Sequence, residues 1–158
     1  MKKTHYKKLI FLFTLTLISS LSHAQWVTKF VNNGIDDPYK IAYSTSKEDD
    51  GVYLKIENVE GGLYFYVQGS YFCEESPYVE MSFLIGNEFD EYYSDVCWLS
   101  EDQSTVFILE DLLESNCIAA FKKSSLVKIS ITDETCGNSS YSFSMSGSSN
   151  AFNYVLNQ

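Results

Sequence analysis

Alternation of apolar and polar residues in short runs is the feature that most limits how this chain can fold. Val52, Leu54 and Ile56 alternate with polar neighbours, and the same period recurs over residues 39–44, 63–67, 79–85, 127–132 and 141–146. In a β-strand, a period of two turns one set of side chains to a buried face and the other to solvent. The sequence therefore predicts a chain built mainly from half-buried strands.

Turns and two less regular runs complete this pattern. Gly86-Asn87 predicts a hairpin turn with a return strand over residues 91–99, and residues 105–109 form a short apolar strand. About eight short strands, with a turn every ten or so residues, predict an all-β fold, either an antiparallel β-sandwich or a jelly roll. A short turn helix is predicted near residues 111–116, and a closing C-terminal helix over residues 149–156.

The first 24 residues have the three parts of a secretory signal peptide. Four lysines precede an apolar run over residues 9–18, and Ser22-His23-Ala24 follows as the cleavage site. We expect residues 1–24 to be a signal peptide and residues 25–158 to form a single β-sandwich domain. The apolar run is too short to span a bilayer, which needs about 20 residues. The chain is therefore expected to be periplasmic or secreted, with no stable membrane insertion.

The mature chain would be acidic and poor in catalytic side chains. All 11 basic residues are lysines, and four lie in the leader, so seven lysines face 21 carboxylates at a formal charge of −14. Such a charge disfavours nucleic acid, which is bound through Lys and Arg, and favours a basic protein partner. Both histidines, His5 and His23, also lie in the leader. Without histidine or arginine, Ser-His-Asp, Cys-His and histidine-zinc sites are excluded, and we expect no enzyme, cofactor or metal.

Four cysteines fall in the predicted mature domain: Cys73, Cys97, Cys117 and Cys136. An even number in a small exported chain predicts two disulfides. Three pairings are possible. We favour Cys73–Cys97 with Cys117–Cys136, because each closes a loop of moderate length between elements expected to be neighbours. A four-thiolate zinc site is disfavoured because no two cysteines are close in the sequence.

Tyrosines supply the candidate binding residues. Tyr64 and Tyr66 lie on the polar face of the predicted strand over residues 63–67, and Tyr53 has the same position on its neighbour. Three tyrosines on adjacent strands can form a stacking platform for sugar rings or a contact patch for a protein. The simpler interpretation is that tyrosine suits strands and covers a sheet face without binding anything.

Carboxylates gather at the expected strand ends, notably at Glu48-Asp49-Asp50 and over residues 88–91. Solvated turns are the simpler interpretation of these clusters. Asp-rich loops also supply the hard oxygen ligands that calcium prefers, although none of these runs has the spacing of an EF-hand loop. A glycosidase would need two carboxylates facing each other across a cleft, which a sequence cannot show.

The carboxy-terminal third carries a more specific pattern. It runs from Asp111-Leu112-Leu113 through an Ala-Phe-Lys-Lys step at residues 120–123 and a strand at 126–132 to a Phe-x-x-x-Gly-Ser-x-x-Ala close at 143–151. Together with Trp26, this order resembles small exported bacterial proteins of the invasion-associated locus B family and the VasI-like proteins associated with type VI secretion. The resemblance covers mainly residues 111–155. It implies a compact β-sandwich in the periplasm or outside the cell, and it implies no catalytic residue.

These features predict a non-enzymatic protein of the bacterial envelope that acts as a binding or accessory module for a protein partner. One concrete form is an acidic immunity or inhibitor protein that neutralises a basic protein. The alternative is a carbohydrate-binding module that uses Tyr53, Tyr64 and Tyr66 against a glycan.

Overall fold

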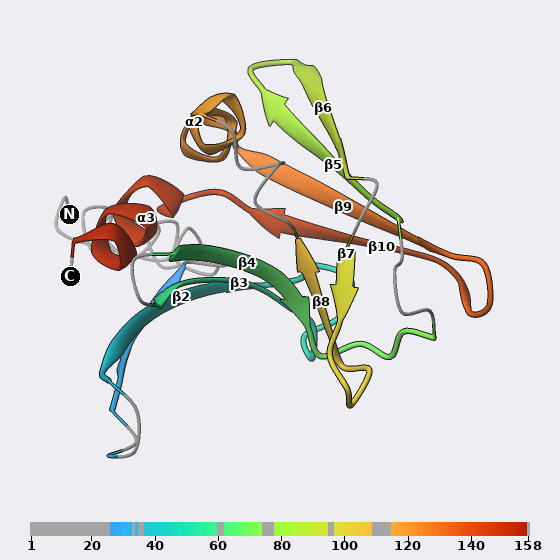
Figure 1. Ribbon diagram of the computed structural model, residues 1–158. Helices are drawn as coiled ribbons and strands as arrows, with labels where there is room; N and C mark the ends of the chain where they lie inside the picture. The colour runs from blue at the N-terminus through green and yellow to red at the C-terminus, as the bar shows by residue number, and fades with distance from the viewer. Residues whose placement is uncertain are drawn as a thin grey trace, which may run out of the picture.

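The computed structural model describes residues 26–32, 34, 37–59, 62–73, 78–94, 97–108 and 115–157. The predicted signal peptide lies outside these ranges, as do residues 111–114 of the turn helix predicted near 111–116. The described strands form two antiparallel sheets with two helices beside them (Figure 1). This arrangement confirms the predicted all-β sandwich.

The larger sheet has six strands in the order β1-β2-β3-β4-β8-β7. Its members are β1 (Val27–Val31), β2 (Tyr39–Thr45), β3 (Tyr53–Val59), β4 (Gly62–Gln68), β7 (Cys97–Leu99) and β8 (Thr105–Ile108). The first four follow one another along the chain as a meander. β4 then pairs with β8, so the chain leaves this sheet after β4 and returns to it later.

The smaller sheet has four strands in the order β10-β9-β5-β6. They are β5 (Tyr78–Ile85), β6 (Glu88–Ser94), β9 (Leu126–Asp133) and β10 (Gly137–Ser144). β5 and β6 form the predicted hairpin around Gly86-Asn87, where Gly86 has the positive φ of 67° that such a turn requires. β5 pairs with β9 across more than 40 residues of chain, which joins the two hairpins into one sheet.

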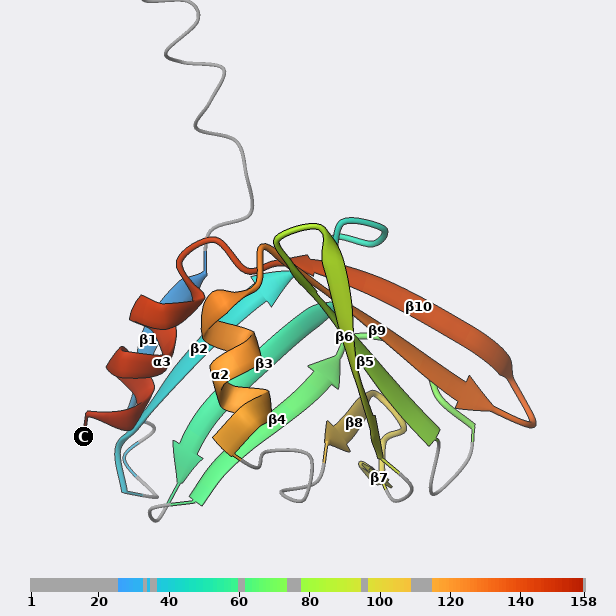
Figure 2. The same ribbon diagram turned by 90° about the horizontal axis from the view of Figure 1, so that it is seen from above.

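Two helices, α2 (Ser115–Lys123) and α3 (Ser148–Leu156), cover one face of the larger sheet, as Figure 2 shows. The predicted C-terminal helix is confirmed as α3. Of the other predicted helix, near residues 111–116, only Ser115 and Asn116 are described, and they begin α2, which continues to Lys123 and buries Ala120 and Phe121. Burial of these two side chains in the core stabilises the last turns of α2.

Four phenylalanines bring the two sheets and the two helices together in the core. Phe65 of β4, Phe83 of β5, Phe121 of α2 and Phe152 of α3 are all fully buried. The ring of Phe121 lies 4.9 Å from Phe65, 4.7 Å from Phe83 and 5.5 Å from Phe152, between ring centroids. Aromatic pairs at this separation add about 0.5–1.5 kcal/mol each beyond the burial of their area. This cluster therefore joins α2 to both sheets and holds α3 against α2 and the larger sheet.

The strand predictions are mostly confirmed, with two differences. The single return strand expected over residues 91–99 is two strands, because β6 ends at Ser94 in the smaller sheet and β7 begins at Cys97 in the larger one. β1 was not predicted, because Val-Thr-Lys-Phe-Val has no clear buried face, and four of its five residues are exposed.

Candidate functional site

The three predicted binding tyrosines lie on one face of the six-stranded sheet, the face that points away from the helices. In the β3–β4 register, Tyr53 pairs with Gln68, Lys55 with Tyr66, and Glu57 with Tyr64. Directly paired residues of an antiparallel sheet share a face. The structure therefore brings Tyr53, Tyr64 and Tyr66 together on this outer face.

The three tyrosines differ strongly in exposure. Tyr64 is 48% exposed, Tyr53 is half-buried, and Tyr66 is only 4% exposed. Burial raises the pKa of Tyr66 above its ordinary value, and its hydrogen bond to the Glu57 carboxylate, together with that negative charge, raises it further. Tyr66 is thus held in place as a neutral hydrogen-bond donor, and its ring is not open to a ligand.

Neighbouring side chains order this outer face further. Lys55 Nζ lies 4.7 Å from the Tyr66 ring centroid and 3.4 Å from Glu57 Oε2. Tyr43 and Tyr53 meet edge to face at 5.7 Å, and Lys29 Nζ lies 5.1 Å from the Tyr43 ring. Each contact contributes little alone, because ion pairs and cation–π pairs near the surface stabilise by about 1 kcal/mol or less. Together they make an outer face with little freedom left to lose on binding.

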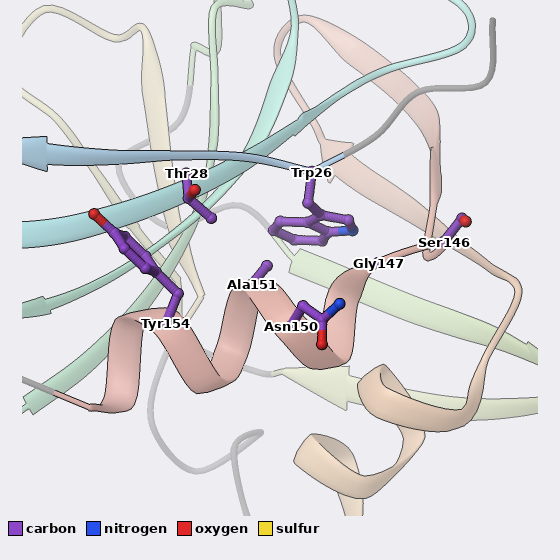
Figure 3. Close-up of a pocket in the computed structure, with 7 residues that line it drawn as sticks. All are labelled: Trp26, Thr28, Ser146, Gly147, Asn150, Ala151 and Tyr154. Carbon is purple, nitrogen blue, oxygen red and sulfur yellow. The ribbon is translucent and has the colours of Figure 1, made fainter. Parts of the chain in front are cut away.

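A cavity of about 460 Å³ lies on the other side of the same sheet, between its end strand and α3 (Figure 3). Its lining is uncharged and mixes aromatic, hydroxyl and amide groups: Trp26, Thr28, Ser146, Gly147, Asn150, Ala151 and Tyr154. Figure 3 shows the Trp26 indole lying over Ala151, with Thr28 and Tyr154 further along the groove. The volume falls within the range of about 300–1,000 Å³ typical of ligand pockets.

Trp26 is anchored by its position in the chain and by its indole. It directly precedes β1, and its Nε1 donates a hydrogen bond of 3.1 Å to the buried Ser144 carbonyl at the end of β10. Opposite it, Gly147 is the N-cap residue that precedes α3, and its φ of 88° lets the chain turn sharply from β10 into the helix. Tyr154 is the one lining side chain that can ionise, so the lining offers recognition rather than acid–base chemistry.

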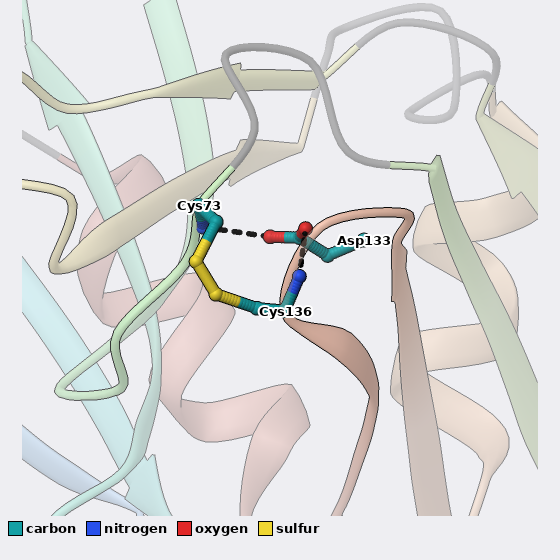
Figure 4. A group of neighbouring side chains, drawn as sticks. All are labelled: Cys73, Asp133 and Cys136. Atoms are coloured by element: carbon teal, nitrogen blue, oxygen red, sulfur yellow. Dashed lines mark hydrogen bonds between the residues drawn. A yellow bond between two sulfur atoms is a disulfide. The ribbon is translucent and has the colours of Figure 1, made fainter.

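Cys73 and Cys136 form a disulfide, drawn in Figure 4 with Asp133 beside it. The favoured pairing of Cys73 with Cys97 and of Cys117 with Cys136 is therefore wrong. The reason is the pairing of β5 with β9, in which Tyr78 lies opposite Thr132. Tyr78 follows Cys73 by five residues and Thr132 precedes Cys136 by four, so this pairing brings the two cysteines into neighbouring parts of the fold.

Asp133 ties together the two segments that this disulfide joins. Its Oδ2 accepts a hydrogen bond of 2.6 Å from the Cys73 backbone, and its Oδ1 accepts bonds from the Thr135 and Cys136 backbones at 2.9 and 2.8 Å. The three side chains lie close enough to hold a metal, with donor atoms within 4.8 Å of one another. With the sulfurs joined and both carboxylate oxygens accepting N–H groups, the arrangement is a structural clamp.

Other carboxylates serve turns in the same way. Burial alone would raise the pKa of Glu48, but hydrogen bonds from the Ser142 backbone and the Ser46 hydroxyl hold it below its ordinary value. Hydrogen bonds from Ser100 and Ser104 likewise lower the pKa of Asp102. Strongly bound carboxylates at turns explain these shifts without a catalytic role.

The most acidic described strand is β6, which ends the smaller sheet. Glu88, Asp90 and Glu91 are exposed along it, and Phe89 between them is 51% exposed. In the β5–β6 register Phe89 and Glu91 share the face of Leu84 and Ser82, whereas Glu88 and Asp90 lie on the other face. An exposed aromatic side chain on a strand with carboxylates on both faces combines apolar contact area with attraction for a basic surface.

Comparisons with known proteins bear on the fold. No protein-family model and no curated protein matches the sequence. Among solved structures, invasion associated protein B from Bartonella henselae is similar over 86% of this chain and 94% of its own, with a TM-score of 0.54 and 14% sequence identity. That likeness shows a shared fold. It confirms, for the fold, the resemblance of residues 111–155 to the invasion-associated locus B group.

One functional feature was missed by sequence reasoning. In the sequence, Trp26 contributes only to the resemblance to the invasion-associated locus B family. The cavity that it lines depends on residues more than 100 positions apart. A tryptophan immediately before an exposed strand was the available signal, since a large aromatic at a strand end must pack on something.

No described helix is both long enough and apolar enough to cross a membrane.

Proposed function

We propose that this chain is an exported, non-catalytic binding protein of the bacterial envelope whose acidic surface engages a basic protein partner. Strand β6 carries the proposal, because at the end of a sheet it presents exposed Phe89 and Glu91 on one face and exposed Glu88 and Asp90 on the other. Charge of this kind speeds association with an oppositely charged surface, and a central aromatic supplies the contact that slows dissociation.

The proposed function requires export, and export is predicted from the signal peptide. The Cys73–Cys136 disulfide agrees with an oxidising compartment, because such bonds persist in the periplasm and outside the cell. The chain also shares its β-sandwich fold with invasion associated protein B of Bartonella henselae. Among the described residues, the carboxylates with shifted pKa values hold turns, which leaves binding as the function that the geometry supports best.

Photo-cross-linking in living cells tests the proposal. A photoreactive phenylalanine analogue at position 89 should give a discrete adduct with a basic envelope protein, and the adduct should fade when Glu88, Asp90 and Glu91 are changed to their amides. The same analogue at Tyr71, which is 67% exposed and outside β6, is the matched control. An adduct indifferent to the amide changes, or none at position 89, would contradict the proposal.

A second candidate function is carbohydrate binding on the outer tyrosine face. It is favoured by Tyr64, which is 48% exposed next to half-buried Tyr53 on that face. Burial of Tyr66 removes one of the three predicted stacking rings. If the function is correct, Tyr64→Ala should abolish binding on a glycan array while Tyr71→Ala retains it. Binding that survives Tyr64→Ala would remove this candidate.

A further inference from the structure

Among the described residues, the two sheets end in four edge strands: β1, β7, β10 and β6. These strands differ in what protects their unpaired backbone groups. Natural sheets shorten, charge or cover their end strands, because unpaired N–H and C=O groups attract other strands. β7 is only three residues long, and β6 carries three carboxylates. β10 is covered by the segment after β2: Ser46 bridges to Phe143, and Lys47 N donates to the Ser142 carbonyl at 2.9 Å.

β1 differs from these three strands. Among the described residues it pairs only with β2, and its sequence, Val-Thr-Lys-Phe-Val, carries one charge. Val27 is 41% exposed and Phe30 is 59% exposed. A five-residue strand with exposed apolar side chains, and with an edge that no described strand covers, is a template for an added strand.

The cavity lies directly beside this open edge. Trp26, Thr28 and Phe30 alternate along β1 and so share the face that α3 covers, and Figure 3 shows β1 and α3 running in the same direction with the cavity between them. A strand added to β1 would point every second side chain into the groove, between Thr28 on one side and Asn150 and Tyr154 on the other. Those side chains must be uncharged, because the lining contains no charged group to pair with them.

Lys29 defines what the remaining side chains should be. It is the charged residue of β1, and its side chain lies on the outer face, over the Tyr43 ring. The residue opposite Lys29 on an added antiparallel strand faces it directly, so an acidic side chain is favoured there and a basic one is disfavoured. A second copy of this chain fits poorly, because symmetric pairing about the centre of β1 would place Lys29 opposite the same lysine.

We propose that the groove between β1 and α3 binds an extended segment of a partner protein, which adds to β1 as a further strand, places uncharged side chains at alternate positions in the cavity, and sets an acidic side chain opposite Lys29. The proposal rests on the proposed function, in that the chain binds a protein. It adds a binding mode that uses main-chain hydrogen bonds for affinity and alternate side chains for specificity. The site is separate from β6, which lies in the other sheet.

Labelled synthetic peptides test this mode with the protein obtained by export of the full chain. One peptide carries Thr-Val-Glu-Val-Thr at its centre, and its partner carries lysine in place of glutamate. Fluorescence anisotropy at low salt should show about tenfold tighter binding of the glutamate peptide. Lys29→Glu should reverse that preference, whereas Lys128→Glu, at an exposed position of β9 in the other sheet, should leave it unchanged.

Filling the cavity gives an independent readout. Asn150→Trp should weaken both peptides about tenfold or more, and Asn153→Trp on the same helix should not, because Asn153 is exposed but does not line the cavity. Thr28→Trp gives the same test from the strand side if the helix variant folds poorly. On peptide binding, amide hydrogen exchange in β1 should slow, since its open edge becomes paired.

Three results would overturn the strand-addition proposal: no binding of either peptide, a preference that Lys29→Glu does not reverse, or concentration-dependent self-association through β1. If the position 89 adduct persists while the peptides fail, strand addition is wrong and the proposed function stands. If the adduct is also absent, the proposed function itself fails.

Discussion

Removal of the Cys73–Cys136 disulfide should cost this domain a large part of its stability. The bond joins residues 63 positions apart. In the chain-entropy model, closing a loop of that length restricts the unfolded chain by about 4 kcal/mol, whereas the shorter loops of the pairing favoured from sequence would give about 3 kcal/mol each. Domains of this size are stable by about 5–15 kcal/mol, so the double variant Cys73→Ala/Cys136→Ala should lose about a quarter or more of that stability.

Two measurements check this expectation. Non-reducing proteolysis with mass spectrometry should recover a peptide pair that contains Cys73 and Cys136. Urea unfolding followed by circular dichroism should then show the double variant losing about 4 kcal/mol, with an increased m-value because its unfolded chain is less constrained. A loss under about 1 kcal/mol, or recovery of a Cys73–Cys97 peptide, would refute the reasoning.

Asp133 provides a matched second perturbation, because it holds the same two segments without a covalent bond. Hydrogen bonds to a charged group contribute about 1.5–3 kcal/mol each, and two of its three N–H partners lie in an exposed turn that water can solvate. Asp133→Asn should therefore cost about 1–2 kcal/mol with the disulfide present. It should cost more without it, since contacts that share a segment are not additive.

The two remaining cysteines should also be joined. Cys97 pairs in register with Ile108, the last residue of β8, and Cys117 follows nine positions later in the first turn of α2. The same digest should therefore yield a Cys97–Cys117 peptide pair. Free thiols at both positions after labelling of the unreduced protein would contradict this.

Three further predictions follow from single positions. Gly69→Ala should destabilise by about 3 kcal/mol or more, because its φ is 104° and an added Cβ would lie 2.0 Å from a backbone carbonyl, whereas Gly86→Ala, with φ of 67° and open space, should cost about 1 kcal/mol in the same urea assay. The lowered pKa of Glu48 means that its stabilisation is present above its ordinary value of 4.5 and is lost as pH falls through the folded-state pKa. Glu48→Gln should thus lower the urea midpoint more at pH 7 than at pH 2, and an equal effect at both would refute it. Trp26→Phe should cost about 1–3 kcal/mol by urea unfolding, through the lost bond to a buried carbonyl and the lost volume; an unchanged midpoint would refute it.

The sequence was sufficient to predict strands wherever one face is continuously apolar. Val79, Met81 and Phe83 of β5 are fully buried as their alternation indicates, and Val127, Ile129 and Ile131 of β9 are too. These strands are central in their sheet, so period and burial agree.

β2 shows where the same reasoning fails. Its alternation points to Tyr39, Ile41 and Tyr43 as the core residues, yet Ala42 and Ser44 are fully buried and the two tyrosines are half-buried on the outer face. The cause is α3, which packs on this strand and needs small side chains beneath it to approach closely. A rule based on hydrophobicity cannot foresee that a helix will select alanine and serine for their size.

The candidate sites were partly predictable for a similar reason. Tyr53, Tyr64 and Tyr66 were placed on one face correctly, because local alternation fixes the face of a strand. Their exposure was not predictable, since Tyr66 is buried by contacts with Lys55 and Glu57 from the neighbouring strand. The disulfide and the cavity depend on pairings between distant segments, which a single sequence does not encode in any short pattern.

The described carboxylates of this chain are of two kinds. Glu48, Asp49, Asp102 and Asp133 each accept backbone N–H groups and so form part of the turns they occupy. Neutralising them would unsettle the fold, so their effect on binding could not be separated from their effect on stability. The carboxylates of β6 lie instead along the open edge of a sheet, beside an exposed phenylalanine. Glu88→Gln and Asp90→Asn change the charge at exposed positions of this strand, and β6 is therefore where an acidic binding function can be tested.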